Sequence, residues 1–137
     1  MSYDKPLPVI DHDSAPYWNA AREGRLDVPL CGNCGKHHFY PRAICPHCFS
    51  DKLTFDTLSG RGTVHTYTIA NRPAGPAFGD DVPYVVALID LEEGPRMMSR
   101  IETDNPNAVT IGAAVEVIFV KVTDEVTFPY FKLARIR

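Results

Sequence analysis

Residues 30–49 read LCGNCGKHHFYPRAICPHCF and hold all four cysteines of the chain: Cys31, Cys34, Cys45 and Cys48. Two Cys-x2-Cys pairs, with ten residues between them, can each place two sulfurs on one tight turn. Two such turns facing each other bring four thiolates into a tetrahedron, which Zn²⁺ accepts at about 2.3 Å per sulfur. The stretch therefore predicts a zinc site with the four cysteines as ligands. A closed site of four thiolates leaves no position for substrate, so we expect the zinc to be structural.

The residues that follow each pair differ. Gly35 comes directly after Cys34 and supplies the positive φ that a knuckle turn uses. Phe49 holds the corresponding place after Cys48, and a side chain makes positive φ costly, so the sequence predicts an irregular second turn. Pro46 pre-sets φ inside the second pair and favours a turn there.

Sets of four cysteines also occur in disulfide frameworks, redox sites and iron centres. A disulfide framework is disfavoured in a reducing compartment, and a redox dithiol would leave the second pair unexplained. Iron bound as in rubredoxin uses the same four sulfurs, and ligand type alone does not separate it from zinc. With four thiolates present the histidines of the stretch are surplus, so we interpret His37, His38 and His47 as surface or second-shell groups.

Composition and length set broad limits. The chain has 137 residues, 45% of them hydrophobic, which suits one compact unit or two small subdomains. The first residues, MSYDKPLPVIDHD, have neither the basic start nor the apolar run of a secretory signal. No segment approaches the roughly 18 apolar residues that cross a bilayer. The sequence therefore predicts a cytoplasmic protein.

A short helix is predicted before the cysteines, in the run DSAPYWNAAREGRL. Asp13 or Ser14 can serve as N-cap, Pro16 suits the first turn, and Gly24 is a stop signal. The simpler interpretation is a helix packed on its own domain. The alternative is that the helix docks on a partner protein through Trp18, the only Trp of the chain, because such anchors favour interfaces.

After the cysteines the hydrophobic period changes toward two, as in strands. Five segments have this pattern or are apolar on both faces: 62–70, 83–91, 96–102, 113–122 and 130–135. Turn signals separate them, among them Glu93-Gly94-Pro95 and a longer link around Pro106 and Gly112. Five strands with a longer connection between the third and fourth predict a barrel of the OB type. A five-stranded sandwich or an SH3-like barrel also fits the pattern.

The charges argue against nucleic acid as the ligand of such a barrel. Between Asp80 and Asp104 there are seven carboxylates, opposed only by Arg96 and Arg100, and the whole chain has net charge −3. A groove that binds a single strand needs clustered Lys and Arg. Single-stranded nucleic-acid binding stays an alternative because five cations surround the cysteine stretch: Arg22, Arg25, Lys36, Arg42 and Lys52.

No catalytic residue is predicted. The sequence has no G-x-S-x-G, no glycine-rich phosphate loop and no HExxH. Asp90, Glu92 and Glu93 lie together, but they are most simply the solvated end of a hairpin.

The order of these parts carries a resemblance: a helix ending in REGRL, the knuckles CGNCG and CPHC, then GRGTVHTYTIA, PYVVALIDLEEGPRMMSRI and FPYFKLARI. The chain resembles the zinc-ribbon and OB-fold proteins that accompany thiolases, thiolase-like aldolases and some enoyl-CoA hydratases, a family formerly called a domain of unknown function. The resemblance implies a mainly β fold with an N-terminal helical segment (1–28), a rubredoxin-like zinc ribbon (29–53) and a five-stranded OB-fold domain (54–137).

The resemblance also implies a role. It indicates a non-catalytic accessory subunit, required within an acyl-CoA thiolase- or aldolase-type complex of lipid metabolism, or alternatively a subunit of an enoyl-CoA hydratase. We expect a hetero-oligomer with a thiolase-like or hydratase partner, and possible contact with acyl-CoA. The candidate residues for contact with ligand or partner are Trp18, Arg42, Arg61, Arg72 and Phe78.

Overall fold

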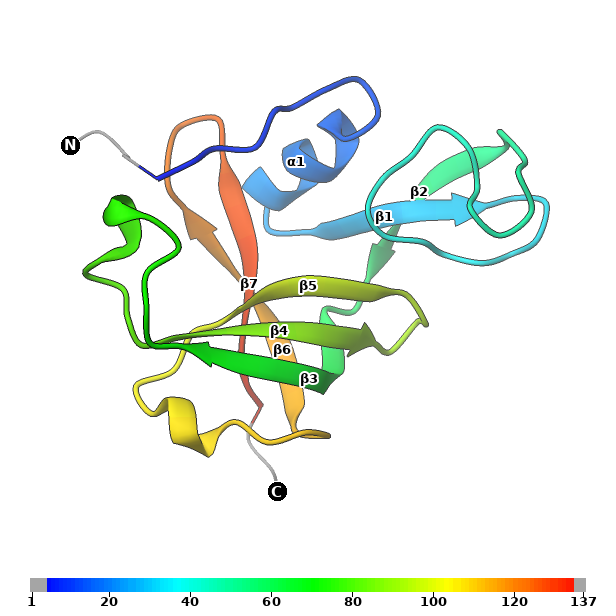
Figure 1. Ribbon diagram of the computed structural model, residues 1–137. Coiled ribbons are helices and arrows are strands. Elements are labelled where there is room, and N and C mark those ends of the chain that lie inside the picture. The colour runs from blue at the N-terminus through cyan, green and yellow to red at the C-terminus, as the bar shows by residue number, and fades with distance from the viewer. Residues whose placement is uncertain (1–4, 135–137) are drawn as a thin grey trace.

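The chain folds as one helix, a two-stranded sheet and a closed barrel in a computed structural model that describes residues 5–134 (Figure 1). The elements in chain order are α1 (Ala15–Arg22), β1 (Leu26–Cys31), β2 (Leu53–Leu58), β3 (Arg61–Ala70), η1 (Pro76–Phe78), β4 (Tyr84–Leu91), β5 (Arg96–Ile101), η2 (Pro106–Ala108), β6 (Ala114–Lys121) and β7 (Thr127–Leu133). None of the helices found between residues 5 and 134 is long and apolar enough to span a membrane.

Helix α1 begins and ends where the sequence predicts. Ser14 is the N-cap residue, and its N–H donates to Asp11 Oδ1 at 2.9 Å, which fixes the entry of the chain into the helix. Pro16 lies in the first turn. Gly24 ends the helix because it takes a φ of 80°, which only glycine adopts at little cost.

A two-stranded antiparallel sheet follows α1, and it was not among the predicted strands. β1 and β2 pair from Leu26 opposite Leu58 to Cys31 opposite Leu53. All four cysteines lie at or beyond the far end of this sheet, which extends beside α1 (Figure 1). β2 starts within the predicted zinc ribbon (29–53) and continues into the predicted OB-fold domain (54–137). The first and last of the three predicted parts include residues outside 5–134, and the division into three parts stays a prediction.

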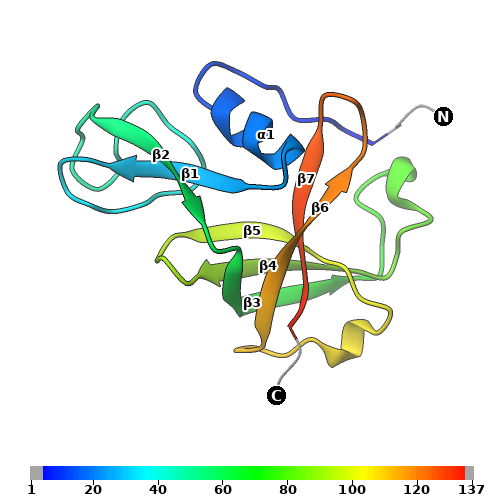
Figure 2. The same cartoon turned by 180° about the vertical axis from the view of Figure 1, so that it is seen from behind.

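The remaining five strands form the predicted barrel, in the order β3-β4-β5-β7-β6 (Figure 2). β3 pairs with β4 and also with β6 at its start, so it closes one side of the barrel. Gly62 permits the close approach of β3 to β4, because a Cβ there would lie 2.6 Å from the carbonyl oxygen of Asp90. On the other side β5 and β7 pair at one position, Ile101 opposite Phe131.

One hydrophobic core joins the barrel, the helix and the base of the two-stranded sheet. Phe131 and Ile89 of the barrel are fully buried, and they belong to the same cluster as Trp18 of α1 and Leu26 of β1. Each buried aliphatic or aromatic side chain contributes about 1.5–3 kcal/mol to folding. The shared core therefore fixes where the sheet that carries the cysteines stands relative to the barrel.

Candidate metal centre

The four cysteine sulfurs converge on one point at the far end of the β1–β2 sheet. They are free thiols, and all four Sγ atoms lie within 4.8 Å of one another. The Sγ atoms of Cys31 and Cys48 are 3.6 Å apart, and those of Cys34 and Cys45 are 3.7 Å apart. A tetrahedron with metal–sulfur bonds of 2.3 Å has edges of about 3.8 Å. The four residues that the sequence predicts as ligands thus fit a tetrahedral metal ion.

The two knuckle turns have the same backbone geometry. Gly35 has a φ of 74° and its N–H donates to the carbonyl of Cys31 at 2.9 Å. Phe49 has a φ of 66° and its N–H donates to the carbonyl of Cys45, also at 2.9 Å. The prediction of an irregular second turn is wrong, because Phe49 takes the left-handed conformation that the turn requires. For a residue with a side chain this conformation costs roughly 1–2 kcal/mol.

Asn33, between the first two cysteines, stabilises thiolates on both knuckles. Its backbone N–H donates to Cys31 Sγ at 3.4 Å, and its side-chain amide donates to Cys48 Sγ at 3.5 Å. The amide of Asn33 and the backbone N–H of Ser50 lower the pKa of Cys48 to about 6. A thiol must lose its proton to bind a metal, so these donors favour binding. Sequence reasoning missed Asn33.

The three histidines of the stretch lie in three different environments, and none of them belongs to the group of converging ligand atoms found among residues 5–134. His37 Nε2 lies 2.7 Å from Asp56 Oδ2, and His47 is exposed. His38 is only 4% exposed, and neither ring nitrogen has a hydrogen-bond partner in the structure. His38 is therefore not a surface group, and burial lowers its pKa.

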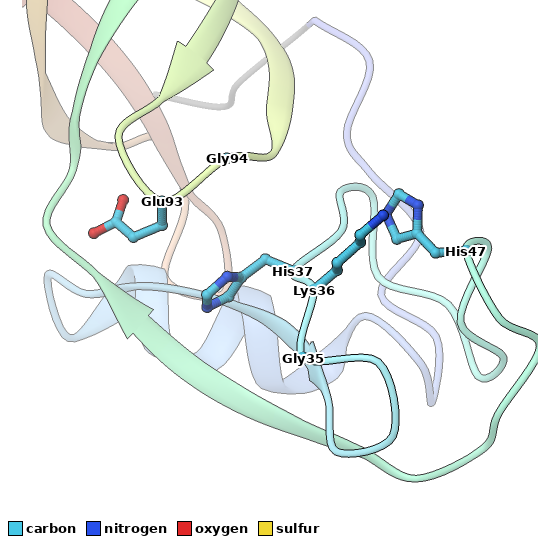
Figure 3. Close-up of a pocket in the computed structure, with 6 residues that line it drawn as sticks. All are labelled: Gly35, Lys36, His37, His47, Glu93 and Gly94. Carbon is cyan, nitrogen blue, oxygen red and sulfur yellow. The ribbon is translucent and has the colours of Figure 1, made fainter.

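A cavity of about 310 Å³ adjoins the first knuckle, between the cysteine stretch and the hairpin that joins β4 to β5 (Figure 3). It is lined by Gly35, Lys36, His37, His47, Glu93 and Gly94. Lys36 and His47 come from the cysteine stretch, and Glu93 comes from the hairpin on the barrel side (Figure 3). The cavity thus contains both signs of charge and is not the uniformly basic surface that a phosphate backbone requires.

The three arginines predicted for contact do not come together. Arg61 starts β3 and lies 3.1 Å from the carboxylate of Glu92. Arg72 comes two residues after Ala70, the last residue of β3, so it lies beyond the opposite end of that strand. Arg42 is exposed on the cysteine stretch. They do not form one cluster of cations for a phosphate group.

The two predicted aromatic contacts also lie apart. Trp18 is 5% exposed and its Nε1 donates to the hydroxyl of Tyr40 at 2.9 Å, so it packs within its own chain. Phe78 is half-buried, with its ring centroid 6.1 Å from that of Tyr84. A role of these residues or of the three arginines in binding a ligand or partner stays a prediction.

The polar side chains of the barrel make structural pairs instead of a catalytic arrangement. The carboxylate of Asp90 accepts a hydrogen bond from Arg96 Nε at 2.6 Å and lies 3.3 Å from His65 Nδ1. Arg96, and to a smaller extent His65, lower the pKa of Asp90. A carboxylate held ionised in this way is a weak proton acceptor. The hydroxyl of Ser99 donates to the carbonyl of Pro129 at 2.7 Å, so no base activates it.

Two family models match consecutive parts of the chain. The rubredoxin-like zinc ribbon domain of ChsH2 matches residues 18–54, which include all four cysteines. The C-terminal OB-fold domain of ChsH2 matches residues 56–120.

Full-length relatives and a solved structure agree with these matches. The chain is 36% identical to a probable enoyl-CoA hydratase alpha subunit of Thermomonospora curvata over 95% of its own length, but it spans only 40% of that protein. It is 43% identical to a DUF35 domain-containing scaffold protein of Methanothermobacter thermautotrophicus, over 69% of this chain and 71% of that one. A chain in the solved structure of the Ltp2–ChsH2(DUF35) aldolase superposes with a TM-score of 0.82 at 34% identity, over 93% of this chain and 98% of that one.

Proposed function

Because the chain belongs to the family of zinc-ribbon and OB-fold proteins that includes the ChsH2 domains and the DUF35 scaffold proteins, we propose that it is a non-catalytic accessory subunit of an acyl-CoA-processing enzyme. The observation that carries the proposal is the likeness to the ChsH2(DUF35) chain of an aldolase, which covers 98% of that chain. The same match covers 93% of this chain.

The partner in this proposal is a thiolase or thiolase-like aldolase, bound in a hetero-oligomer in the cytoplasm. The solved relative is part of an aldolase, which supports this choice. A second candidate partner is an enoyl-CoA hydratase chain, because the hydratase alpha subunit aligns with 95% of this chain. Four free thiols suit a reducing compartment.

The metal in this proposal is zinc, held by Cys31, Cys34, Cys45 and Cys48. The sulfur separations of 3.6 and 3.7 Å support a tetrahedral ion. All four positions of the ion would be filled by protein, so zinc would contribute folding energy and no reaction chemistry. The ribbon would stiffen the end of the β1–β2 sheet, and the barrel and helix would contact the partner and the acyl-CoA.

Copurification tests the proposal. The tagged full chain is captured from its source cells, and the bound proteins are identified by mass spectrometry. We expect a thiolase-like or hydratase-like chain in stoichiometric amount, and turnover of an acyl-CoA thioester by the complex. The isolated chain should be inactive. Thioester turnover by the isolated chain, or a monodisperse monomer that binds neither such a partner nor acyl-CoA, would contradict the proposal.

Titration with a single-stranded oligonucleotide tests the alternative class. A protein that binds through phosphates gains affinity steeply as salt is removed. With net charge −3 and a mixed-charge cavity beside the ribbon, we expect no binding at low ionic strength. Tight, salt-dependent binding would favour the nucleic-acid function instead.

A further inference from the structure

The barrel closes between β5 and β7 along a seam that holds a single backbone pair, and Pro129 lies where this pairing stops. The two strands run parallel and pair at Ile101 and Phe131, where the N–H of Glu102 donates to the Phe131 carbonyl at 2.8 Å. The next pair along this ladder would be Ser99 with Pro129. Proline has no N–H to donate, and its carbonyl accepts from the Ser99 hydroxyl instead. The ladder therefore stops after one pair.

Beyond this pair, no backbone pairing joins the β5 edge to β7 within the described residues. Backbone groups alternate between the two edges of a strand, so the N–H and C=O of Met98 point to the same edge as the N–H of Glu102. In the part of the chain that the structure describes, that edge of Met98 faces no paired strand. Met98 is 66% exposed, so this residue lies at the surface of the barrel.

An apolar groove of about 390 Å³ lies along this seam. The residues that line it include Trp18 of α1, Tyr40 of the cysteine stretch, and Met97 and Met98 of β5. Methionine adapts its shape to a bound side chain and is common at peptide-binding surfaces. The groove suits a bulky apolar side chain, and the strand edge suits a peptide backbone.

The charges around the seam favour a peptide over a CoA thioester as its occupant. Arg96 pairs with Asp90 at 2.6 Å. Arg100 pairs with Asp81 at 3.0 Å and with Glu102 at 2.7 Å. The phosphates of CoA need cations that are not already neutralised. A neutral peptide backbone has no such need.

We propose that the seam binds an extended segment of the partner subunit, which pairs with the backbone of Met98 and places a bulky apolar side chain in the groove. This is strand addition to an open sheet edge. The proposal specifies how the partner of the proposed function is bound, and in that respect it rests on that function.

A blocked pentapeptide tests the site without the partner. The probe is acetyl-Thr-Val-Phe-Val-Thr-amide, added to the full metal-loaded chain, and the readout is the fluorescence of Trp18, the only Trp of the chain. We expect a saturable change. The same peptide methylated on the Phe nitrogen keeps its side chains but loses a backbone donor, so it should bind roughly tenfold more weakly.

Two substitutions test the strand edge. Met98→Pro removes the edge N–H and should weaken peptide binding roughly tenfold, whereas Met98→Leu keeps it and should bind within about twofold of the wild type. Pro129→Val restores the missing donor, which should extend the β5–β7 ladder, slow hydrogen exchange of the Arg100 amide and abolish the Trp18 response. Pro76→Val, outside the groove, is the control.

The outcomes separate this proposal from the proposed function. Each of three results overturns the seam as a peptide site. They are no saturable change in Trp18 fluorescence up to millimolar peptide, equal affinity for the methylated and unmethylated peptides, and equal affinity of the Met98→Pro and Met98→Leu variants. If acetyl-CoA changes the Trp18 fluorescence and the peptide does not, the groove binds a thioester. That result also overturns the peptide proposal. Copurification of a partner is decided by a different experiment, so the proposed function can stand when this proposal falls.

Discussion

Asn33 donates to Cys31 Sγ through its backbone at 3.4 Å and to Cys48 Sγ through its side chain at 3.5 Å, and so links the two knuckles of the cysteine ribbon. The side-chain bond can be removed by substitution, whereas the backbone bond persists. One residue between the first two cysteines therefore helps to hold a sulfur that comes fifteen positions after it in the chain.

Asn33→Ala is expected to weaken metal binding roughly tenfold, the usual effect of losing a group that supports a ligand. Competition with a chromophoric chelator measures the affinity. Asn71→Ala removes an exposed asparagine far along the chain and is the control. Equal affinities for the two variants would show that the Asn33 amide does not stabilise the bound thiolates.

Phe49→Gly is expected to raise the free energy of unfolding of the metal-loaded protein by about 1 kcal/mol. The residue is held at a φ of 66°, and its side chain is 79% exposed, so little packing is lost. Urea denaturation measures the change. Phe49→Ala keeps a Cβ at the same φ and should gain nothing. A less stable glycine variant would mean that the Phe49 ring makes contacts worth more than the strain.

Removal of the metal is expected to unfold the ribbon, because binding energy at a four-thiolate site is also folding energy. Chelation and Cys45→Ser should each lower the melting temperature and expose the amides of 30–50 to hydrogen exchange. Elemental analysis of the wild type should find one zinc per chain. Full thermal stability of the variant would exclude a structural metal, and iron in the site would exclude zinc.

Gly62→Ala is expected to destabilise the barrel by about 1–3 kcal/mol. The new methyl group would lie 2.6 Å from the Asp90 carbonyl oxygen and 2.9 Å from Ile89 Cγ2, where β3 pairs with β4. Thermal denaturation checks this. Gly75→Ala is the matched control, because nothing lies within 4 Å of a Cβ at that position. Comparable melting temperatures for the two variants would contradict a close approach of β3 and β4 at Gly62.

Stability should fall in mild acid because of His38. Burial lowers the pKa of its imidazole below the ordinary value of 6.5, so the folded chain resists a proton that the unfolded chain accepts. The free energy of unfolding therefore decreases as the pH falls below about 6.5, until the pKa of the folded state is reached. His38→Phe should flatten this part of the pH profile, measured by urea denaturation at a series of pH values. An unchanged slope would mean that other groups cause it.

The strands that could be predicted from the sequence are those whose pattern is local. Each of the five barrel strands shows its own alternation or apolar run, and the structure has a strand at all five places. The last one was predicted to begin at Tyr130, but β7 begins at Thr127 and includes Pro129. Proline normally ends a strand, and here it is tolerated because its missing N–H faces the seam where the ladder stops.

The β1–β2 sheet could not be predicted in the same way. β1 contains Pro29, a residue that is unfavourable in strands. In β2 the apolar residue Phe55 is exposed, so hydrophobicity along this strand does not follow burial. The two segments meet only when the cysteine loops between them close, so the pairing depends on contacts distant in sequence. The convergence of the four cysteines was predictable from their spacing, whereas the contact of Asn33 with Cys48 depends on where Cys48 lies in space.

The register of the β1–β2 sheet limits how this family can be re-engineered. Leu26 lies opposite Leu58 at the end that joins the common core, and Cys31 lies opposite Leu53 at the end that carries the four cysteines. Side chains alternate between the two faces, so inserting one residue in either strand would turn its core leucine to the solvent. When a ribbon is exchanged between two relatives, we therefore expect function to be retained only if each of the two strands changes length by an even number of residues or not at all.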